Sequence, residues 1–226
     1  MNFLKRVFYF ILAVIVCTAI RLVVRNGIDA LFDLFSSSSS PSPSYTAAAS
    51  SVSSSSENSG SYPTGDSVDK LTSRAQSGDT DAMIALGWKY ETGNGAPQDY
   101  AMAMQWYQKA ADSGAPYGLN RIGDLYYYGY GVARDYAKAL TYYRKAVSKG
   151  DVAALCNMGY MYEAGLGGIT QNYSKALDYY QRAANQGSGL GMQYIGYLYQ
   201  HGRGVPKDAA QAQLWFDKAR AAGYTE

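Results

Sequence analysis

The chain has 226 residues, of which 47% are hydrophobic and 17% are charged, and its formal net charge at pH 7 is +2. So small an excess of basic residues gives no electrostatic reason to expect binding to nucleic acid. With 2 cysteines and 1 histidine, the chain also lacks the ligands of a histidine- or cysteine-based metal centre, so no metal or other cofactor is expected.

An apolar stretch opens the chain. Lys5 and Arg6 precede a run that extends, interrupted only by Arg21, from Val7 to Val24, a span of 18 residues. At about 1.5 Å per residue, a helix of this length nearly spans the roughly 30 Å hydrocarbon core of a bilayer. The pattern predicts an uncleaved membrane anchor. A signal peptide cut after Ala19 and a peripheral amphipathic helix are the alternatives.

Charge gives only weak information about the orientation of this anchor, because basic residues lie at both of its ends. A short basic leader usually stays in the cytoplasm, which favours a cytoplasmic amino terminus. The remainder of the chain is then expected in the periplasm or another extracytoplasmic space. Residues 22–35 have an amphipathic pattern, so residues 1–35 together are assigned to the anchor and its extension.

Serine dominates residues 36–66, accompanied by Pro41, Pro43 and Pro63. This composition cannot bury enough apolar surface to offset chain entropy, and it predicts a disordered tether. A capping helix is expected over residues 67–78. Its Leu71 and Ala75 occupy the positions that Tyr107 and Ala111 hold in the next unit. This half-unit is therefore expected to cover the open end of the next pair of helices.

Beyond residue 78, whole sets of residues recur at a step of 36 or 37 positions. Self-similarity at this period is the signature of stacked helical units. The units predicted are residues 79–114, 115–150, 151–187 and 188–226. The recurring sets are glycines at the unit ends (Gly78, Gly114, Gly150, Gly187, Gly223), internal glycines (Gly87, Gly123, Gly159, Gly196), and capping residues (Asp99, Asp135, Asn172, Asp208).

Each unit is predicted to be a pair of helices. In residues 115–150, small and apolar residues recur at steps of three and four, which marks one face of a helix. Gly129-Tyr130-Gly131 then breaks that helix, and Asp135 is placed to cap a second one. A single hairpin of this kind cannot bury its apolar face alone, so the sequence predicts an all-α solenoid.

The repeated string resembles a known family. Ala82-x-x-x-Leu86-Gly87-x-x-Tyr90, followed by Asp99-Tyr100-x-x-Ala103 and Ala110-Ala111-x-x-Gly114, is similar to the Sel-one-like repeat, a relative of the tetratricopeptide repeat. The resemblance covers about two thirds of the chain. It implies a right-handed α-solenoid, and a role as an adaptor or scaffold that holds other proteins. The disulfides of some cysteine-rich members are not implied, because the cysteines here are Cys17 and Cys156.

Packing roles follow from residue size. The internal glycines are expected to let the two helices of a unit approach closely. The aromatic pairs of the second helices are expected to fill the seams between units; these pairs are Trp106-Tyr107, Tyr142-Tyr143, Tyr179-Tyr180 and Trp215-Phe216.

No catalytic residue is predicted, and the protein is not expected to be an enzyme. The Gly-x-Gly turns recur with the structural period and follow helices, which favours a turn over a phosphate site. His201 sits beside a turn glycine, as expected of a solvated helix end, and Cys156 is interpreted as a half-buried helix thiol.

Positions on the first helices that differ between units are the candidate partner-binding residues. Such positions are interpreted as free of the packing rule, and aromatic residues and arginine are enriched where proteins bind one another. The resemblance implies that this helix lines a concave groove; a merely solvated face is the alternative. The candidates are Trp88, Arg121, Asp124, Tyr128, Asn157, Tyr160, Tyr194 and Tyr197.

The sequence therefore predicts a membrane-tethered adaptor that binds a protein or peptide in its inner groove, with no small-molecule substrate. Three other hypotheses remain open. One is an envelope immunity protein that neutralises a toxic effector, the second is a cell-envelope hydrolase, and the third is an architectural spacer without a saturable partner.

Overall fold

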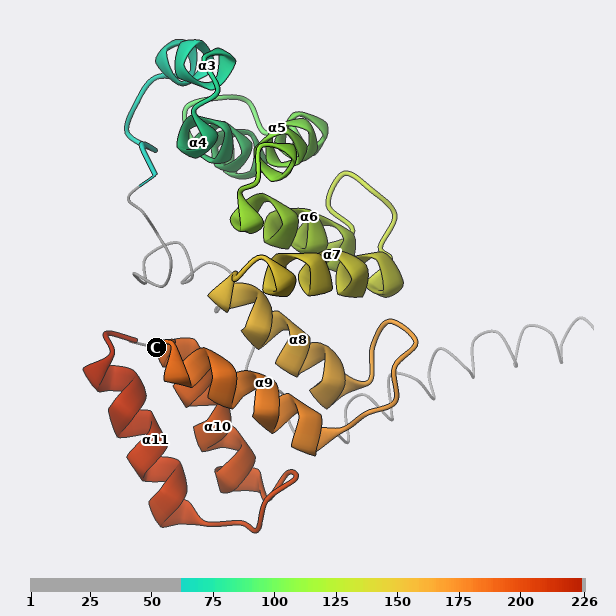
Figure 1. The fold of residues 1–226 in the computed structure, drawn as a ribbon, viewed down its shortest axis with the longest axis vertical. Coiled ribbons are helices and arrows are strands. Elements are labelled where there is room, and N and C mark those ends of the chain that lie inside the picture. The colour runs from blue at the N-terminus through green and yellow to red at the C-terminus, as the bar shows by residue number, and fades with distance from the viewer. Residues whose placement is uncertain (1–61, 225–226) are drawn as a thin grey trace, which may run out of the picture. The chain divides into compact units, whose positions relative to one another are not determined.

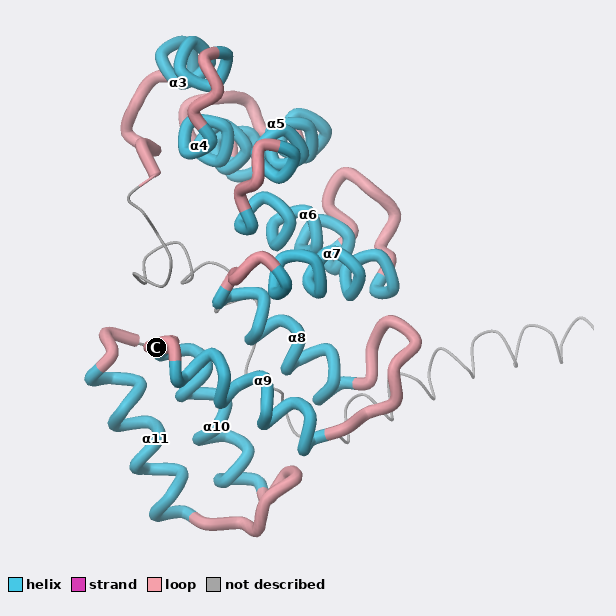
Figure 2. Tube along the Cα trace, in the orientation of Figure 1, coloured by secondary structure: helices cyan, strands magenta, loops and turns pink. Residues whose placement is uncertain are grey.

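The computed structural model describes residues 62–224, and the predicted anchor, together with most of the predicted tether, lies outside that range. Every helix and turn in the described part belongs to an all-α arrangement of paired helices (Figures 1 and 2). The helices are α3 (Val68–Gln76), α4 (Thr80–Thr92), α5 (Tyr100–Asp112), α6 (Pro116–Tyr128), α7 (Tyr136–Ser148), α8 (Val152–Ala164), α9 (Tyr173–Asn185), α10 (Gly189–His201) and α11 (Ala209–Ala221).

The predicted start and stop signals are confirmed. The side chains of Asp99, Asp135, Asn172 and Asp208 each accept a hydrogen bond from a backbone N–H in the first turn of the second helix of a unit. Such a bond satisfies a donor that the helix itself leaves unpaired. The first helices end at glycines in the left-handed conformation, such as Gly129 with φ 77°, where a side chain would be strained.

The close approach of the two helices in a unit depends on the internal glycines, as predicted. A Cβ atom added at Gly87 would lie 2.4 Å from the ring of Tyr107. The equivalent distances are 2.5 Å from Gly123 to Tyr143, 2.4 Å from Gly159 to Tyr180 and 2.4 Å from Gly196 to Phe216. The second-helix aromatic ring thus occupies the space that a side chain at the glycine of the first helix would need.

The seams between units differ at one position of the first helix, which is glycine in units 2 and 4 and alanine in unit 3. At Gly118, an added Cβ would lie 2.6 Å from the carbonyl oxygen of Tyr107, and at Gly191 it would lie 2.8 Å from the Cβ of Ala183. The equivalent residue of unit 3 is Ala154, which is fully buried. The α7–α8 seam therefore accommodates a methyl group that the α5–α6 and α9–α10 seams exclude.

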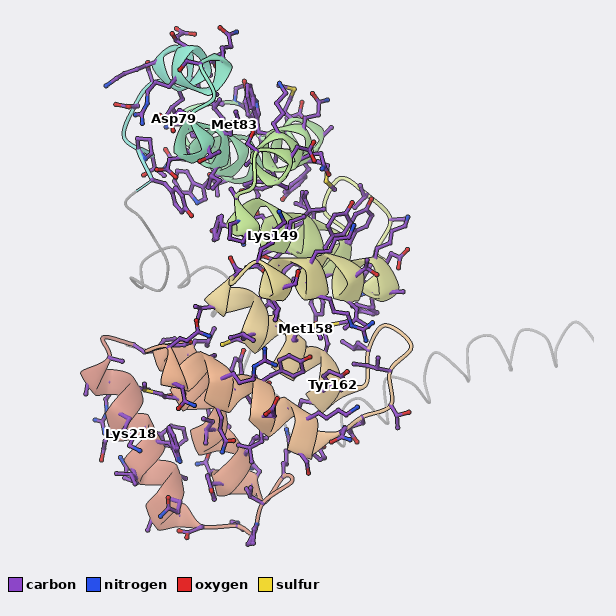
Figure 3. All side chains as sticks on the ribbon, viewed as in Figure 1. Asp79, Met83, Lys149, Met158, Tyr162 and Lys218 are labelled. Atoms are coloured by element: carbon purple, nitrogen blue, oxygen red, sulfur yellow. The ribbon has the colours of Figure 1, made fainter. Side chains whose placement is uncertain are left out.

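The apolar core runs continuously through the described units rather than forming one central cluster. Met158 and Met161 of α8 pack with Leu140 and Tyr143 of α7. Figure 3 shows Met158 and Tyr162 on the same helix, and the ring of Tyr162 stacks on Tyr179 of α9 at 5.5 Å. One helix thus contributes to the seam before it and to the hairpin after it.

Helix α3 covers the first hairpin as predicted, with Leu71 at 0% and Ala75 at 4% exposure in the cluster that includes Met83 and Leu86. The tether prediction needs a correction at residues 62–66. Asp66 forms ion pairs with Lys70 and Arg74, and Tyr62 packs against the same cluster. These few residues find charged and aromatic partners that their composition does not reveal.

No helix within residues 62–224 combines the length and the apolar character needed to cross a bilayer. The predicted anchor lies outside that part of the chain, as does the sequence assigned to the tether before Tyr62. The right-handed sense of the solenoid remains a prediction.

Candidate functional site

A network of buried polar side chains joins the first helices of units 1, 2 and 3. Arg121 of α6 pairs with Glu91 of α4 through one guanidinium nitrogen and with Asp124 of its own helix, at 2.7 Å, through another. The Arg121 side chain is only 14% exposed. We call this the inner polar network; its members are Glu91, Tyr107, Asn120, Arg121, Asp124, Tyr143 and Asn157.

Tyrosine hydroxyls of the second helices complete the network. Tyr107 donates to Glu91 at 2.6 Å, and Tyr143 donates to Asp124 at 2.8 Å. Unit 3 repeats the arrangement of unit 1, since Tyr180 donates to Glu163 at 3.0 Å and Arg203 of unit 4 pairs with Glu163 at 2.9 Å. A buried phenol requires such an acceptor.

The network also crosses the wider seam between units 2 and 3. Asn157 of α8 donates through Nδ2 to the side-chain oxygen of Asn120 at 2.8 Å and lies 3.3 Å from Oδ1 of Asp124. Both acceptors belong to α6. Polar contacts between first helices thus link two units whose α7–α8 seam accommodates the methyl group of Ala154.

Burial sets the electrostatics of the network. Loss of solvation raises the pKa of Asp124 to about 6, although the charge of Arg121 and the hydrogen bond from Tyr143 oppose that shift. Burial acts to lower the pKa of Arg121, but the charges of Glu91 and its other neighbours outweigh it and hold that pKa well above the usual value. At neutral pH Arg121 is therefore charged, and the pKa of Asp124, about 6, lies roughly one pH unit below neutrality.

Tyrosine rings form a continuous row beside the network. Tyr130, which is 40% exposed, stacks between Tyr100 at 5.1 Å and Tyr128 at 5.2 Å. Tyr128 meets Tyr127 edge to face at 4.9 Å, and Tyr127 meets Tyr160 at 6.1 Å. Two of the predicted binding residues, Tyr128 and Tyr160, therefore belong to one row of aromatic rings that reaches from unit 1 to unit 3.

The interpretation of the candidate positions as free of packing is wrong for three of them. Asp124 is 7% exposed, Asn157 8% and Tyr194 6%. Asp124 and Asn157 are held in the network, and the ring of Tyr194 stacks on Tyr180 at 4.7 Å. Side chains at these positions contact the neighbouring unit. The residue type therefore varies between units because one seam is held by hydrogen bonds and another by stacked rings.

Arg121 is also held in the network, and the four remaining candidates are more accessible. Trp88, Tyr128, Tyr160 and Tyr197 are half-buried. Tyr197 lies edge-on to Phe216 at 5.3 Å and its hydroxyl accepts from Gln193 at 3.1 Å, within unit 4. The structure thus brings together Arg121, Asp124 and Asn157 in the network and Tyr128 with Tyr160 in the aromatic row, while Trp88 belongs to unit 1.

Sequence reasoning missed the acceptors Glu91 and Glu163. A signal was present, because units 1 and 3 carry glutamate at this position and tyrosine on the second helix, whereas unit 4 carries Gln200 with Phe216. A glutamate thus accompanies the phenolic hydroxyl in units 1 and 3 and is replaced in unit 4, where the hydroxyl is missing. In unit 2 the position holds Tyr127, and the hydroxyl of Tyr143 donates to Asp124 instead.

Residues 62–224 contain no group of three or more histidine, cysteine, aspartate or glutamate side chains arranged to hold a metal ion. His201 ends α10 and is exposed, as predicted. The thiol of Cys156 is more deeply buried than predicted, with 1% exposure, and it lies 3.6 Å from the hydroxyl of Ser188. The larger burial follows from the close contact of α8 with the start of the next unit.

Comparison with solved structures shows the same repeat. A protective antigen of uropathogenic Escherichia coli is 34% identical, with a TM-score of 0.62 over 70% of this chain and 34% of its own. A Sel1 repeat protein from Oxalobacter formigenes is 29% identical, with a TM-score of 0.62 over 70% of this chain and 64% of its own. The chain thus spans about a third and just under two thirds of the length of these proteins.

A weaker likeness, with 24% identity and a TM-score of 0.40 over 69% of this chain and 73% of the other, connects it to an immunity protein of Pseudomonas aeruginosa. So low a similarity says nothing of function. Curated protein sequences give no match. The Sel1 repeat model, however, matches residues 80–114, 116–151, 152–188 and 189–224, well over half of the sequence. The chain therefore belongs to the Sel1 repeat family.

Proposed function

We propose that the protein is an adaptor that binds a protein or peptide partner along the first helices of its repeats. The observation that supports this most directly is that some side chains of those helices pack between units while others remain accessible. Asp124, Asn157 and Tyr194 are used for packing between units, whereas Trp88, Tyr128, Tyr160 and Tyr197 retain accessible surface. Half-buried aromatic side chains on a rigid frame are the type of residue that dominates binding energy between proteins.

The inner polar network supports the proposal because it fixes the positions of adjacent units relative to one another. Ion pairs and hydrogen bonds between first helices hold adjacent units in one register, so the accessible aromatics keep fixed spacings. A preorganised surface loses less conformational freedom on binding, and this favours affinity.

The test uses the triple variant Trp88→Ala/Tyr160→Ala/Tyr197→Ala. A matched control changes three exposed second-helix residues, Lys109→Ala/Arg144→Ala/Gln181→Ala. A photo-crosslinking residue at position 128 in each background would capture the bound partner in cells. Loss of the crosslinked species in the aromatic variant alone, with unchanged circular dichroism, is expected. Equal capture in both backgrounds contradicts the proposal.

We also propose that residues 1–35 anchor the protein in a membrane and hold the repeats on the extracytoplasmic side. The support is the apolar run from Val7 to Val24 behind a short basic leader. Protease added to intact cells should then degrade the repeats only after the outer barrier has been opened, and alkaline carbonate should leave the protein in the membrane fraction. Release by carbonate would contradict the anchor.

The enzymatic alternative receives no support from the site. The carboxylates of Glu91 and Asp124 are each bound to Arg121 and to a tyrosine hydroxyl. An acid–base pair needs a carboxyl that reaches a substrate, and these groups are directed at one another. The network is therefore interpreted as structural.

A further inference from the structure

A short segment before α3 is attached to the repeats at both of its ends. In Figure 1 it runs from the start of α3 back past α4. The ring of Tyr62 lies 5.3 Å from the ring of Tyr117, in the first turn of α6. Asp66 holds the other end through ion pairs of 2.8 Å to Lys70 and 2.9 Å to Arg74. Residues 62–66 thus form a strap, which we call the Tyr62 strap.

The strap is folded by its own backbone between these two ends. The N–H of Thr64 donates to the carbonyl oxygen of Tyr62 at 2.7 Å, and the N–H of Asp66 donates to that of Pro63 at 3.0 Å. The proline ring also restricts the backbone next to Tyr62. The ring of Tyr62 is therefore held against Tyr117 by a short segment with a defined shape.

The place that Tyr62 occupies is aromatic and apolar. Tyr62 and Tyr117 both pack against the core cluster that contains Ile84 of α4, which is 3% exposed. We call the Tyr117 ring and this part of the cluster the strap seat. The packing of the repeat does not require an aromatic residue at the position of Tyr117, because the other units carry Asp81, Ala153 and Leu190 there.

The strap can leave without stranding a charged group. The Lys70 side chain is 63% exposed, and Arg74 is also paired, at 2.7 Å, with Asp79, which caps α4. Ion pairs as exposed as that between Asp66 and Lys70 contribute little to stability. Release of the strap would instead uncover the ring of Tyr117, and burial of such an apolar surface by a new occupant is favourable.

The strap seat belongs to the face of α6 that carries candidate binding residues. Tyr117, Arg121, Asp124 and Tyr128 follow one another at steps of four, three and four, so they lie on one face of the helix. Arg121 and Asp124 are held in the inner polar network, and Tyr128 belongs to the aromatic row. The strap therefore covers the amino-terminal end of a face whose other end carries the half-buried Tyr128.

We propose that the Tyr62 strap is an internal competitor of the partner: Tyr62 occupies the seat that an aromatic side chain of a bound partner segment takes, so the strap leaves when that segment binds. An aromatic occupant is indicated because ring pairs about 4.5–7 Å apart in offset or tilted geometry gain energy beyond area burial. The pair seen here is tilted by 35°. The inference rests on the proposed function, since it adds the chemistry of the partner and a regulation of the same face.

The first test removes the ring of the competitor. In the full-length protein with the photo-crosslinking residue at position 128, Tyr62→Ala should raise the yield of captured partner about 10-fold at limiting partner, since the binding-competent state no longer has to be freed from the strap. Tyr62→Phe keeps the ring and should capture as little as the wild type. A permanent cap over the first hairpin predicts otherwise: unchanged or reduced capture in Tyr62→Ala overturns the proposal.

The second variant releases the other end of the strap and leaves the seat untouched. Asp66→Ala removes both ion pairs to α3. The matched control is Asp69→Ala, which removes the same charge from an exposed position three residues further on. Circular dichroism establishes that both variants are folded. Capture should rise in Asp66→Ala, by less than in Tyr62→Ala because the ring contact remains, and should not change in Asp69→Ala. Equal capture by the two variants overturns the proposal.

The third test supplies the strap from outside. Full-length Tyr62→Ala is titrated with a fluorescein-labelled peptide of residues 59–66, up to the millimolar concentrations that a short tether imposes on its own segment. It should bind this peptide at least about 10-fold more tightly than the wild type does. A peptide with alanine in the place of Tyr62 should bind about 10-fold more weakly, and Tyr117→Ala should abolish that difference. Equal affinity for the two peptides, or of the first peptide for the two proteins, overturns the proposal.

These results are separable from the adaptor test. If the triple aromatic variant loses the partner while Tyr62→Ala and Asp66→Ala capture no more than the wild type, the adaptor function stands and the competition fails. If the triple variant captures as much partner as its control while the strap peptide still distinguishes Tyr62→Ala from the wild type, the proposed function fails and the strap seat stands.

Discussion

The Nδ2 atom of Asn157 donates a 2.8 Å hydrogen bond to the side-chain oxygen of Asn120. The two residues belong to the first helices of consecutive units, so this bond joins units directly and not through the aromatic seam. Both side chains are buried, with 8% and 3% exposure. Buried amides of this kind specify a register, because any other alignment would leave them unpaired.

Replacing Asn157 should therefore destabilise the seam between units 2 and 3. Asn157→Ala leaves the acceptor of Asn120 without its donor and removes a neighbour of Asp124. An unpaired buried group costs about 1–3 kcal/mol, measured as the free energy of unfolding in urea. Asn185→Ala, at an exposed helix position, is the control and should change stability by less than about 0.5 kcal/mol.

The internal glycines give a graded prediction. Gly87→Ala would place a methyl group 2.4 Å from the ring of Tyr107, which is 0% exposed and cannot move aside. Overpacking of this kind costs about 1–3 kcal/mol, more than the roughly 1 kcal/mol that alanine gains over glycine in a helix. Thermal unfolding should show a lower Tm. Gly196→Ala should cost less, since the ring opposite is Phe216, which is only partly buried. Equal costs at both sites would refute this interpretation of the packing.

The tyrosine–glutamate pairs should be energetically coupled. Tyr180→Phe leaves Glu163 with Arg203 alone, and Glu163→Gln weakens both contacts. The double variant reproduces the combination that unit 4 carries, Gln200 with Phe216. We expect the double variant to cost less than the sum of the single changes by about 0.5–1.5 kcal/mol in a double-mutant cycle of urea unfolding. Strict additivity would show that the hydroxyl and the carboxylate do not depend on each other.

Stability should depend on pH through two buried carboxyls. Burial raises the pKa of Asp124 and of Asp151 to about 6 in the folded protein, from an ordinary value of 3.8. Between these values the folded state binds more protons than the unfolded state, so the contribution of these groups is present below about pH 4 and is lost as the pH rises through about 6. The expected loss is about 1–3 kcal/mol per group.

The measurement is the free energy of unfolding in urea at pH 4.5 and pH 7.5. Asp151→Asn keeps an acceptor for the α8 cap but cannot ionise, so it should flatten the profile and raise stability at pH 7.5. Two other carboxyls have lowered pKa values. The main cause is a hydrogen bond from the backbone N–H of Ala82 at Asp79 and from that of Lys138 at Asp135. These two groups make the protein less stable as the pH falls, at lower pH than the effect of Asp151. An unchanged profile in Asp151→Asn would show that this group does not carry the effect.

Local rules explain why the fold was predictable. Helix ends were signalled by Asp135 and Gly129, whose roles depend only on backbone geometry within a turn. The close approach at Gly87 was predicted from the recurrence of a glycine at one period in every unit, but Tyr107 was assigned to the seam between units, and only the structure placed its ring against Gly87. Repetition converts a weak local pattern into a strong one, since each unit tests the same prediction again.

The candidate site was harder to predict, because burial at Asp124, Asn157 and Tyr194 depends on distances between units. The period of the repeat indicates which face of a helix looks inward, but only the packed seams decide how near the next first helix comes. The difference between Gly118 and Ala154 is a single methyl group, and it alters the seam through backbone contacts.

The contact between the rings of Tyr62 and Tyr117 likewise joins residues far apart in the chain, and no local pattern around Tyr62 encodes it. Sequence alone therefore determined the units and their internal packing, which rest on short-range sterics. The tertiary structure decided which inward-facing side chains stay accessible, because that depends on long-range geometry.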